Sequence, residues 1–511
     1  MTWFDESRSE KETGSIRSMA MPYGMGWAIR TRSHSGAAAL PVPEGIQLLG
    51  PVYWIAGGML AGVSFRYGGI EALTIVLAIL VALWAFADSH NALELCTLFM
   101  VYLFVFFQRE APLGEELPEE FFFWGAGVAL ITAGLCGAAL LSSGTSWPLV
   151  RKRMTSWPSL AMWAMLIMIV GAAANGLFLG NQPFAVVRQL FGCLLLPTYY
   201  FIALVILRSS DQVARWLVRS SWAVALGAAW YVLKLLSASM ARGVYYREQS
   251  PLTGYAGVIG VVAFAGILEQ RNLWRKATAF VQASICSTAI VLMGNRAALA
   301  SLTIAAGLLV IVCVRRRGWL ATTLATIVVA SAIAGAFYYG NRFLDNRGIG
   351  GDIARRFIIK VSDDRSFQGR MAQMDAVMDV IRKRPVLGAG MGSETVFVAP
   401  EEGRLRLTSV DNGWGYVMLK TGLLGLAIFV AFLALILRES LRNLLRSTPG
   451  TLRSNSLALL GLLLFGLVVF WSGPSLLHFT SAGFFGTALA ATSVLAESRH
   501  AAAAGGAEWP R

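Results

Sequence analysis

The chain has 511 residues, of which 56% are hydrophobic and 14% are charged, and its mean hydropathy is +0.60. A soluble core cannot absorb that much apolar sequence, so the composition excludes an ordinary soluble enzyme and favours a polytopic membrane protein. The formal net charge of +14 does not indicate nucleic acid binding, because the basic residues cluster between apolar segments, where positive charge marks cytoplasmic loops.

Apolar segments long enough to cross a bilayer follow one another along most of the chain. Residues 1–45 precede them and lack an apolar signal-peptide core, so we expect a disordered cytoplasmic tail there. At the usual length of about 20 residues a span, the predicted cores are 46–65, 70–88, 91–108, 121–143, 160–179, 183–207, 220–238, 254–268, 278–294, 297–313, 319–339, 413–437, 455–472 and 479–496.

The predicted fold is therefore all-α, a polytopic membrane bundle of about 12–14 transmembrane helices with one large periplasmic loop. The domain boundaries follow from the gap between the spans. Residues 46–339 form a first bundle of about 11 helices, 340–411 the large loop, 412–496 a bundle of about three helices, and 497–511 a cytoplasmic tail.

If the N-terminus is cytoplasmic and successive loops lie on alternate sides of the membrane, every short basic loop falls on the cytoplasmic face. This is what the positive-inside rule requires. These loops are residues 151–153, 208–219, 269–276, 315–317 and 438–453. The opposite face receives the acidic segment 109–120, the short segment 241–254 and the long segment 340–411. The long segment is the one extramembrane region large enough to hold a site.

Arg296 in "MGNRAALASL" lies between two segments that are otherwise apolar. An arginine in mid-membrane costs roughly 2.5 to 3.5 kcal/mol, so its position needs a reason. The predicted topology places Arg296 at the outer end of a tight hairpin, where the side chain reaches water or a headgroup. Two interpretations stay open: an interfacial arginine that only extends to water, and a functional residue.

The long loop contains "MAQMDAVMDVIRKRP", whose spacing predicts a short amphipathic helix on the membrane surface or over the bundle. Pro385 ends this helix, and the predicted apolar face carries Met371, Met374, Val377, Met378 and Ile381.

Glycines at 388, 390 and 392 follow in "PVLGAGMGSE". No strand precedes them and no βαβ unit surrounds them, which excludes a dinucleotide site. A flexible turn that brings backbone close to a ligand is the remaining interpretation.

Asp411 and Asn412 stand at the start of the next span, in "SVDNGWGYVMLKTGLLG". Residues of this type commonly cap helices. A carboxylate that faces a cavity under a basic loop is also suited to accept a proton. Both interpretations stay open.

Taken together, "GNRAALAS", "GRMAQMDAVMDVIRKRPVLGAGMG" and "DNGWGYVMLKTGLLG" in this order resemble the O-antigen ligase and Wzy-type polysaccharide polymerase superfamily, integral-membrane glycosyltransferases that use polyprenyl-pyrophosphate-linked glycans. The resemblance covers about residues 180–440 and extends more loosely to "VVRQLFGCLLLPTYYF", with Arg188. It implies that Arg296 and Arg370 bind the donor pyrophosphate.

In the ligases of this superfamily a histidine precedes the asparagine at the helix entrance, whereas this chain has Asp411 there. The Asp-Asn pair is more similar to the exopolysaccharide polymerase branch. The resemblance thus implies a metal-independent, inverting glycosyltransferase without a cofactor, in which Asp411 takes the proton of the acceptor hydroxyl and two guanidinium groups stabilise the departing pyrophosphate.

Further substrate-binding candidates lie on the same predicted side. Arg242, Tyr245, Tyr246 and Arg247 in "ARGVYYREQS" offer charges and stacking surfaces, although a plain interfacial belt explains them equally well. Asn412, Tyr416 and, as a substitute for the missing imidazole, His478 complete the candidates.

The expected location is a bacterial inner membrane, with both termini cytoplasmic and the active site periplasmic. Expected partners are the lipid-linked glycan donor, the glycan acceptor and membrane lipids. A flippase and a chain-length regulator of the same pathway are further candidate partners, and no nucleic acid is expected. Two alternatives remain: a ligase that transfers glycan to lipid A core or another acceptor, and a transporter or flippase. Transporters tend to show internal repeats and broken helices, and no repeat is evident between the two halves.

Overall fold

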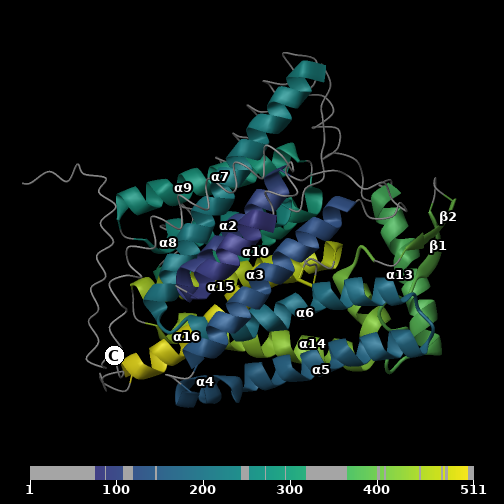
Figure 1. Cartoon of the computed structure of the whole chain (residues 1–511). Helices are drawn as coiled ribbons and strands as arrows, with labels where there is room; N and C mark the ends of the chain where they lie inside the picture. Colours follow the sequence, from purple (N-terminus) through teal and green to yellow (C-terminus); the bar gives the residue numbers. More distant parts are fainter. Residues whose placement is uncertain are drawn as a thin grey trace, which may run out of the picture.

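The protein is a bundle of long helices with a small hairpin at one end (Figure 1). The computed structural model describes residues 75–86, 88–106, 119–143, 147–242, 252–270, 272–293, 295–317, 365–399, 403–407, 410–447, 450–473, 476–477 and 481–503. Apolar composition over 18 to 34 residues is what produces these helices, since a backbone in lipid must satisfy its hydrogen bonds internally.

After an apolar helix over Ile75–Phe86, the elements in chain order are α2 (Ser89–Phe106), α3 (Glu119–Ser143), α4 (Trp147–Met154), α5 (Trp157–Phe178), α6 (Pro183–Ile206), α7 (Ser210–Arg242), α8 (Leu252–Glu269), α9 (Leu273–Leu292), α10 (Arg296–Arg317), α13 (Arg365–Lys383), β1 (Thr395–Ala399), β2 (Gly403–Leu407), α14 (Gly413–Arg446), α15 (Thr451–Val469), the 3₁₀ turn η3 (Phe470–Ser472) and α16 (Ala482–Ala503).

The all-α membrane bundle predicted from the sequence is confirmed. Twelve of the fourteen predicted cores coincide with helices in the described part of the chain, and the remaining two, 46–65 and 319–339, lie outside it. Within that part, six helices are long and apolar enough to cross a membrane. The predicted tail at 1–45 and most of the acidic segment 109–120 also fall outside the described residues. Of the predicted tail at 497–511, residues 497–503 belong to α16 and 504–511 fall outside the described residues.

The core is continuous from α2 to α16, and helices distant in sequence pack closely in it. The main helix contacts join α6 with α16, α8 with α9 and α15, and α5 with α6 and α14. Small residues allow some of these approaches: an ideal Cβ on Gly486 of α16 would lie 2.5 Å from the Leu196 carbonyl oxygen of α6.

Basic segments meet at one end of the bundle, here called the basic end and defined by the Arg153–Glu497 and Arg453–Glu269 ion pairs. The Nε atoms of the arginines lie 2.7 and 3.0 Å from the carboxylates. Asn443 near the end of α14 accepts from Arg499 at 2.9 Å, which joins the ends of α14 and α16. Three of the five predicted basic loops, 151–153, 269–276 and 438–453, therefore contribute to one end.

The opposite end, here called the glycine end, holds residues 385–393 together with the starts of α6 and α14. In Figure 1, α13 and the β1–β2 hairpin lie beside this end of α5, α6 and α14. The hairpin is antiparallel, with Phe397 opposite Leu405. It lies in a loop for which the sequence analysis predicted only a helix and a turn.

Candidate functional site

Helix α14 is broken at Gly422, whose φ of 68° and ψ of −168° interrupt the helical backbone. The break frees backbone groups, and residues 385–393 ("PVLGAGMGS", the glycine segment) bind them. Leu423 N donates to Pro385 O at 2.8 Å, and Ala389 N donates to Leu419 O at 2.8 Å. A broken helix is tolerated at membrane depth where protein satisfies its backbone in this way.

The glycine segment is also held by α5 and by the turn between α5 and α6. Met391 N donates to Ala172 O at 2.9 Å, and the Asn181 amide donates to Ala389 O at 3.0 Å and to Met391 O at 2.8 Å. Gly392 N donates to Gln189 Oε1 at 2.8 Å. The segment is thus clamped between three helices.

Positive φ angles and close contacts explain why glycines occupy positions 388, 390 and 392. Their φ values are 66°, 75° and 75°. An ideal Cβ at Gly390 would lie 2.4 Å from Gly176 N, and one at Gly388 would lie 2.6 Å from Leu419 O. The sequence analysis expected a flexible turn near a ligand, but the backbone here is packed against the protein's own helices.

Lys420, which the sequence analysis missed, anchors the same segment from α14. Its side chain is buried, with an exposure of 1%, and Nζ donates to Ser393 O at 2.7 Å and to Ser393 Oγ at 3.1 Å. Lysine is rarely buried to this extent without such partners. The sequence does contain a signal for a special role of Lys420, because it is a single charged residue within an otherwise apolar span.

Asn412 caps α14, because its side-chain oxygen accepts from Trp414 N at 2.9 Å and from Gly415 N at 3.1 Å. Asp411 is exposed, and its backbone N donates to Gln373 Oε1 of α13 at 2.9 Å. Of the two interpretations of this pair, capping thus applies to Asn412. The Asp411 carboxylate is not the cap, which leaves it available for other chemistry.

Helix α13 ends two residues before Pro385, as predicted, and the Gln373 contact fixes it against the entrance of α14. Its buried line differs from the predicted face. Gln373, Val377 and Ile381 are buried, whereas Met371 and Met378 are 50% and 39% exposed. The reason is that β1 and α14 pack on the face of α13 that carries Gln373, Val377 and Ile381. Gln373 lies on this face because its side chain accepts a hydrogen bond from the backbone N of Asp411.

Arg370 lies one helical turn before Gln373 on α13. Its side chain is half-buried, and Nε is shielded from solvent and has no hydrogen-bond partner among the described residues. A shielded guanidinium NH without a partner is costly unless an anion or another acceptor completes it. This position therefore suits the predicted role in anion binding.

Arg296 is the first residue of α10, directly after the tight turn from α9, as the sequence predicted. Asn295 precedes it and accepts from Ala298 N at 3.0 Å, which caps α10. The Arg296 side chain is half-buried. On the other side of the turn, Thr253 Oγ1 donates to Met293 Sδ at 3.0 Å, so the turn is held against the start of α8.

Arg188 and Tyr416 connect α6 and α14 near the glycine segment. Arg188 is half-buried and interacts electrostatically with both Tyr416 and Lys420. Tyr416 is 7% exposed, and its hydroxyl lies 3.8 Å from Cys193 Sγ. Its described contacts are with protein, so the expected contact with substrate stays a prediction.

Five predicted site residues are not placed by these contacts. Arg242 is the last residue of α7, and its side chain lies outside the described residues, as do Tyr245, Tyr246, Arg247 and His478.

The remaining candidates gather at the glycine end. Arg188 and Asp411 belong to elements that contact the glycine segment or α13 directly. Phe470, after α15, packs on Trp414 at a ring distance of 5.1 Å, and the start of α8 beside Arg296 lies at the same end of α15. Cationic and anionic candidates from α6, α10, α13 and α14 thus share one end of the bundle, opposite the basic end.

A family model described as O-Antigen ligase matches residues 279–430. The matched segment runs from α9 through α10 and α13 into α14, past the break at Gly422, and includes Arg296, Arg370 and Asp411. The match confirms the resemblance to the O-antigen ligase and Wzy-type superfamily, and it supports glycan transfer of the ligase or polymerase type in general. A comparison with curated proteins found no match.

Proposed function

We propose that this protein transfers a glycan from a polyprenyl-pyrophosphate donor, and that it acts as a polymerase that elongates lipid-linked repeat units. The observation that carries the proposal is the family match at 279–430, which includes the three residues with the predicted chemical roles at one end of the bundle. Asp411 in place of the histidine of the ligases favours the polymerase over the ligase.

The reaction that we propose is a direct displacement at the anomeric carbon of the donor sugar. The acceptor hydroxyl loses its proton to the Asp411 carboxylate and forms a new bond from its oxygen to the anomeric carbon. The bond from that carbon to the pyrophosphate oxygen breaks, and the polyprenyl pyrophosphate leaves with the electron pair. Attack from the face opposite the leaving group inverts the anomeric configuration.

Arg296 and Arg370 are proposed to bind the pyrophosphate. A guanidinium offers paired planar donors to phosphate oxygens, and it stabilises the leaving group more as negative charge grows on it, which lowers the barrier. Two observations support this assignment: Nε of Arg370 has no hydrogen-bond partner among the described residues, and both side chains are half-buried. With two guanidinium groups in this role, we expect transfer to continue in the presence of a chelator.

The second candidate is a ligase that transfers the finished glycan to lipid A core or another acceptor. The description of the matching family as O-Antigen ligase favours it. In that case another group has to take the proton that a histidine takes in the ligases, and the exposed Asp411 carboxylate is the candidate base.

The experiment that separates the two candidates uses purified protein, a polyprenyl-pyrophosphate-linked repeat unit and a chelator, with and without added lipid A core. Elongation of the lipid-linked chains without core supports the polymerase. Transfer that occurs only after core is added supports the ligase. No transfer under either condition contradicts the proposed function.

The proposed location is a bacterial inner membrane, with the glycine end on the periplasmic face. Positive charge at the opposite, basic end supports this orientation, because basic loops remain on the cytoplasmic side. Labelling of single cysteines introduced at the two ends of α14, with a reagent that does not cross the membrane, tests the orientation directly.

A further inference from the structure

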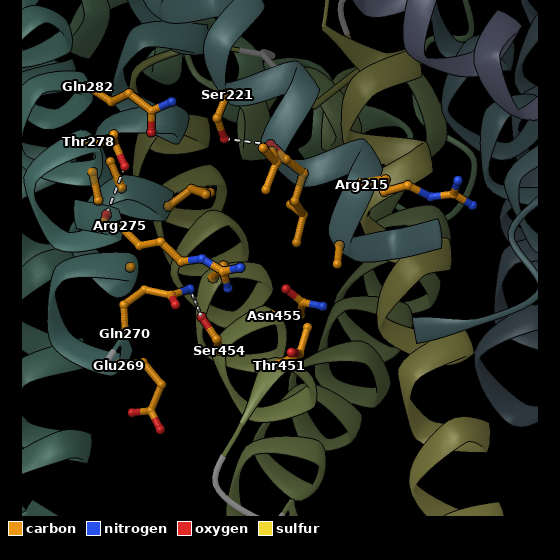
Figure 2. A pocket seen from close by; sticks show the side chains of 18 of the residues that line it. Arg215, Ser221, Glu269, Gln270, Arg275, Thr278, Gln282, Thr451, Ser454 and Asn455 are labelled. Atoms are coloured by element: carbon orange, nitrogen blue, oxygen red, sulfur yellow. Dashed lines mark hydrogen bonds between the residues drawn. The ribbon is translucent and has the colours of Figure 1, made fainter. Parts of the chain in front are cut away.

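A cavity of about 910 Å³ opens at the basic end, between α7, the turn from α8 to α9, and the start of α15 (Figure 2). Its size is within the range of sites that hold small molecules or headgroups, about 300 to 1,000 Å³. The cavity lies at the opposite end of the bundle from the candidate glycan-transfer site, and that site does not account for it. Residues that matter for its chemistry are Val218, Trp222, Arg275, Gln282, Gly450 and Thr451.

Positive charge at the cavity comes mainly from Arg275. In Figure 2 its side chain extends from α9 toward Ser454 and Asn455 of α15. Among the described residues its guanidinium forms no ion pair. The carboxylate of Glu269 is paired with Arg453 instead, with Nε and Oε1 3.0 Å apart.

The other arginines near the cavity are directed elsewhere. Arg219 is paired with Glu94 and donates to Asn91 Oδ1 at 2.8 Å, both on α2. Arg215 extends away from the labelled polar groups in Figure 2. Among the described lining residues, Arg275 is therefore the arginine best placed to contact a ligand in the cavity.

Neutral donors line the same space. Gln282 of α9 is 8% exposed, its amide points toward the cavity in Figure 2, and it forms no hydrogen bond within the described part of the chain. Helix α15 begins at Thr451, and Gly450 before it provides no side-chain cap. Both residues line the cavity, so it lies at the N-terminus of α15, where the first backbone NH groups of a helix favour a negative charge.

An apolar stripe on α7 continues from the cavity. Val218 and Trp222 line the cavity and are 58% and 36% exposed. Leu226, Trp230 and Leu233 follow at intervals of three and four residues along the same helix face, and their exposures are 64%, 54% and 61%. In a membrane this stripe faces the acyl chains of lipids.

We propose that this cavity binds one anionic phospholipid. Its phosphate contacts the Arg275 guanidinium, the Gln282 amide and the start of α15, while an acyl chain lies along Val218, Trp222 and the α7 stripe. Basic pockets between membrane helices have this combination of a charged recess and an apolar exit. A soluble phosphate compound uses only the charged part, whereas the exposed stripe next to it matches a lipid.

Lipid binding to the purified, delipidated full chain in detergent tests the proposal, with native mass spectrometry as the readout. The probes are phosphatidylglycerol, phosphatidylcholine and glycerol 3-phosphate. The variants are Arg275→Gln and Trp222→Ala. Arg438→Gln is the matched control, because Arg438 is an exposed arginine of α14 outside the cavity lining.

We expect wild type to bind phosphatidylglycerol more tightly than phosphatidylcholine. Arg275→Gln should weaken phosphatidylglycerol binding about fivefold, the usual effect of one basic residue at a membrane surface, and Arg438→Gln should leave it unchanged. Trp222→Ala should weaken binding of both lipids.

Three results would overturn the proposal. They are equal binding of the two lipids, unchanged phosphatidylglycerol binding in Arg275→Gln, and displacement of the lipid by glycerol 3-phosphate at a concentration equal to that of the lipid. The last result would identify a site for a soluble phosphate compound.

Discussion

Gly390→Ala tests how tightly the glycine segment is docked. The φ of Gly390 is 75°, and the left-handed region costs a residue with a Cβ about 1 to 2 kcal/mol. The added Cβ would also lie 2.4 Å from Gly176 N and 3.0 Å from Ala172 O, so the backbone of α5 or of the segment has to move. Overpacking of this kind adds about 1 to 3 kcal/mol.

The expected loss in free energy of unfolding is therefore about 2 to 5 kcal/mol, from the sum of the two costs. Part of the loss comes through the hydrogen bond from Met391 N to Ala172 O, which cannot keep its length of 2.9 Å after the shift. Titration with sodium dodecyl sulfate, followed by near-ultraviolet circular dichroism of the purified protein, measures this free energy.

Two matched variants separate the backbone cost from the packing cost. Gly180 has a φ of 78° but open space around it, so Gly180→Ala should lose only about 1 to 2 kcal/mol. Gly171 lies within α5 with open space around it, so Gly171→Ala should be neutral or stabilise by up to about 1 kcal/mol. If Gly390→Ala loses no more stability than Gly180→Ala, the close packing of the segment on α5 is refuted.

Three further substitutions test the surroundings of the site in the same unfolding titration. Asn412→Ala removes the cap of α14 and should cost about 1 kcal/mol, whereas Asn412→Asp keeps an accepting oxygen and should cost less; equal losses would contradict the capping role. Lys420→Met leaves the Ser393 carbonyl without its donor and should cost about 1 to 3 kcal/mol, and a stability equal to that of wild type would argue against the anchor. Arg153→Gln leaves the Glu497 carboxylate without its ion-pair partner and should lower the free energy of unfolding by about 3 to 5 kcal/mol. The double variant with Glu497→Gln should lose less, and additive losses would show that the pair is not coupled.

Hydropathy predicted most helices because each long apolar run has one stable backbone in lipid, the helix. The break in α14 was not predictable in this way. Gly422 and Gly425 occur in the same apolar run, yet only Gly422 leaves the helical region. The difference comes from residues 385–389, which bind the freed backbone of α14 and are distant in sequence.

The hairpin at 395–407 left a local signal that the sequence analysis did not use. In "TVFVA", Thr395 and Phe397 are buried while Val396 and Val398 are exposed, the alternation of a strand with one covered face. The resemblance predicted Arg296, Arg370 and Asp411 as site residues, and their roles stay predictions. The contact of Gln373 with Asp411, and those of Asn181 and Lys420 with the glycine segment, were not predictable, because each side chain bonds to backbone that only the fold brings near.

The central claim is that Asp411 and Arg296 act in glycan transfer at the glycine end. Its most direct test is the elongation of a polyprenyl-pyrophosphate-linked repeat unit by reconstituted protein in chelator. The test compares wild type with Asp411→Asn and Arg296→Lys, and the matched controls are Asp375→Asn and Arg382→Lys, exposed residues of α13. Asp411→Asn removes the proton acceptor and Arg296→Lys removes the planar fork, so both should lose transfer by 100-fold or more, on the order of one general base or one charge-stabilising group.

Both controls should transfer at the rate of wild type. Normal elongation by Asp411→Asn or by Arg296→Lys, in protein that folds as wild type does, would contradict the account.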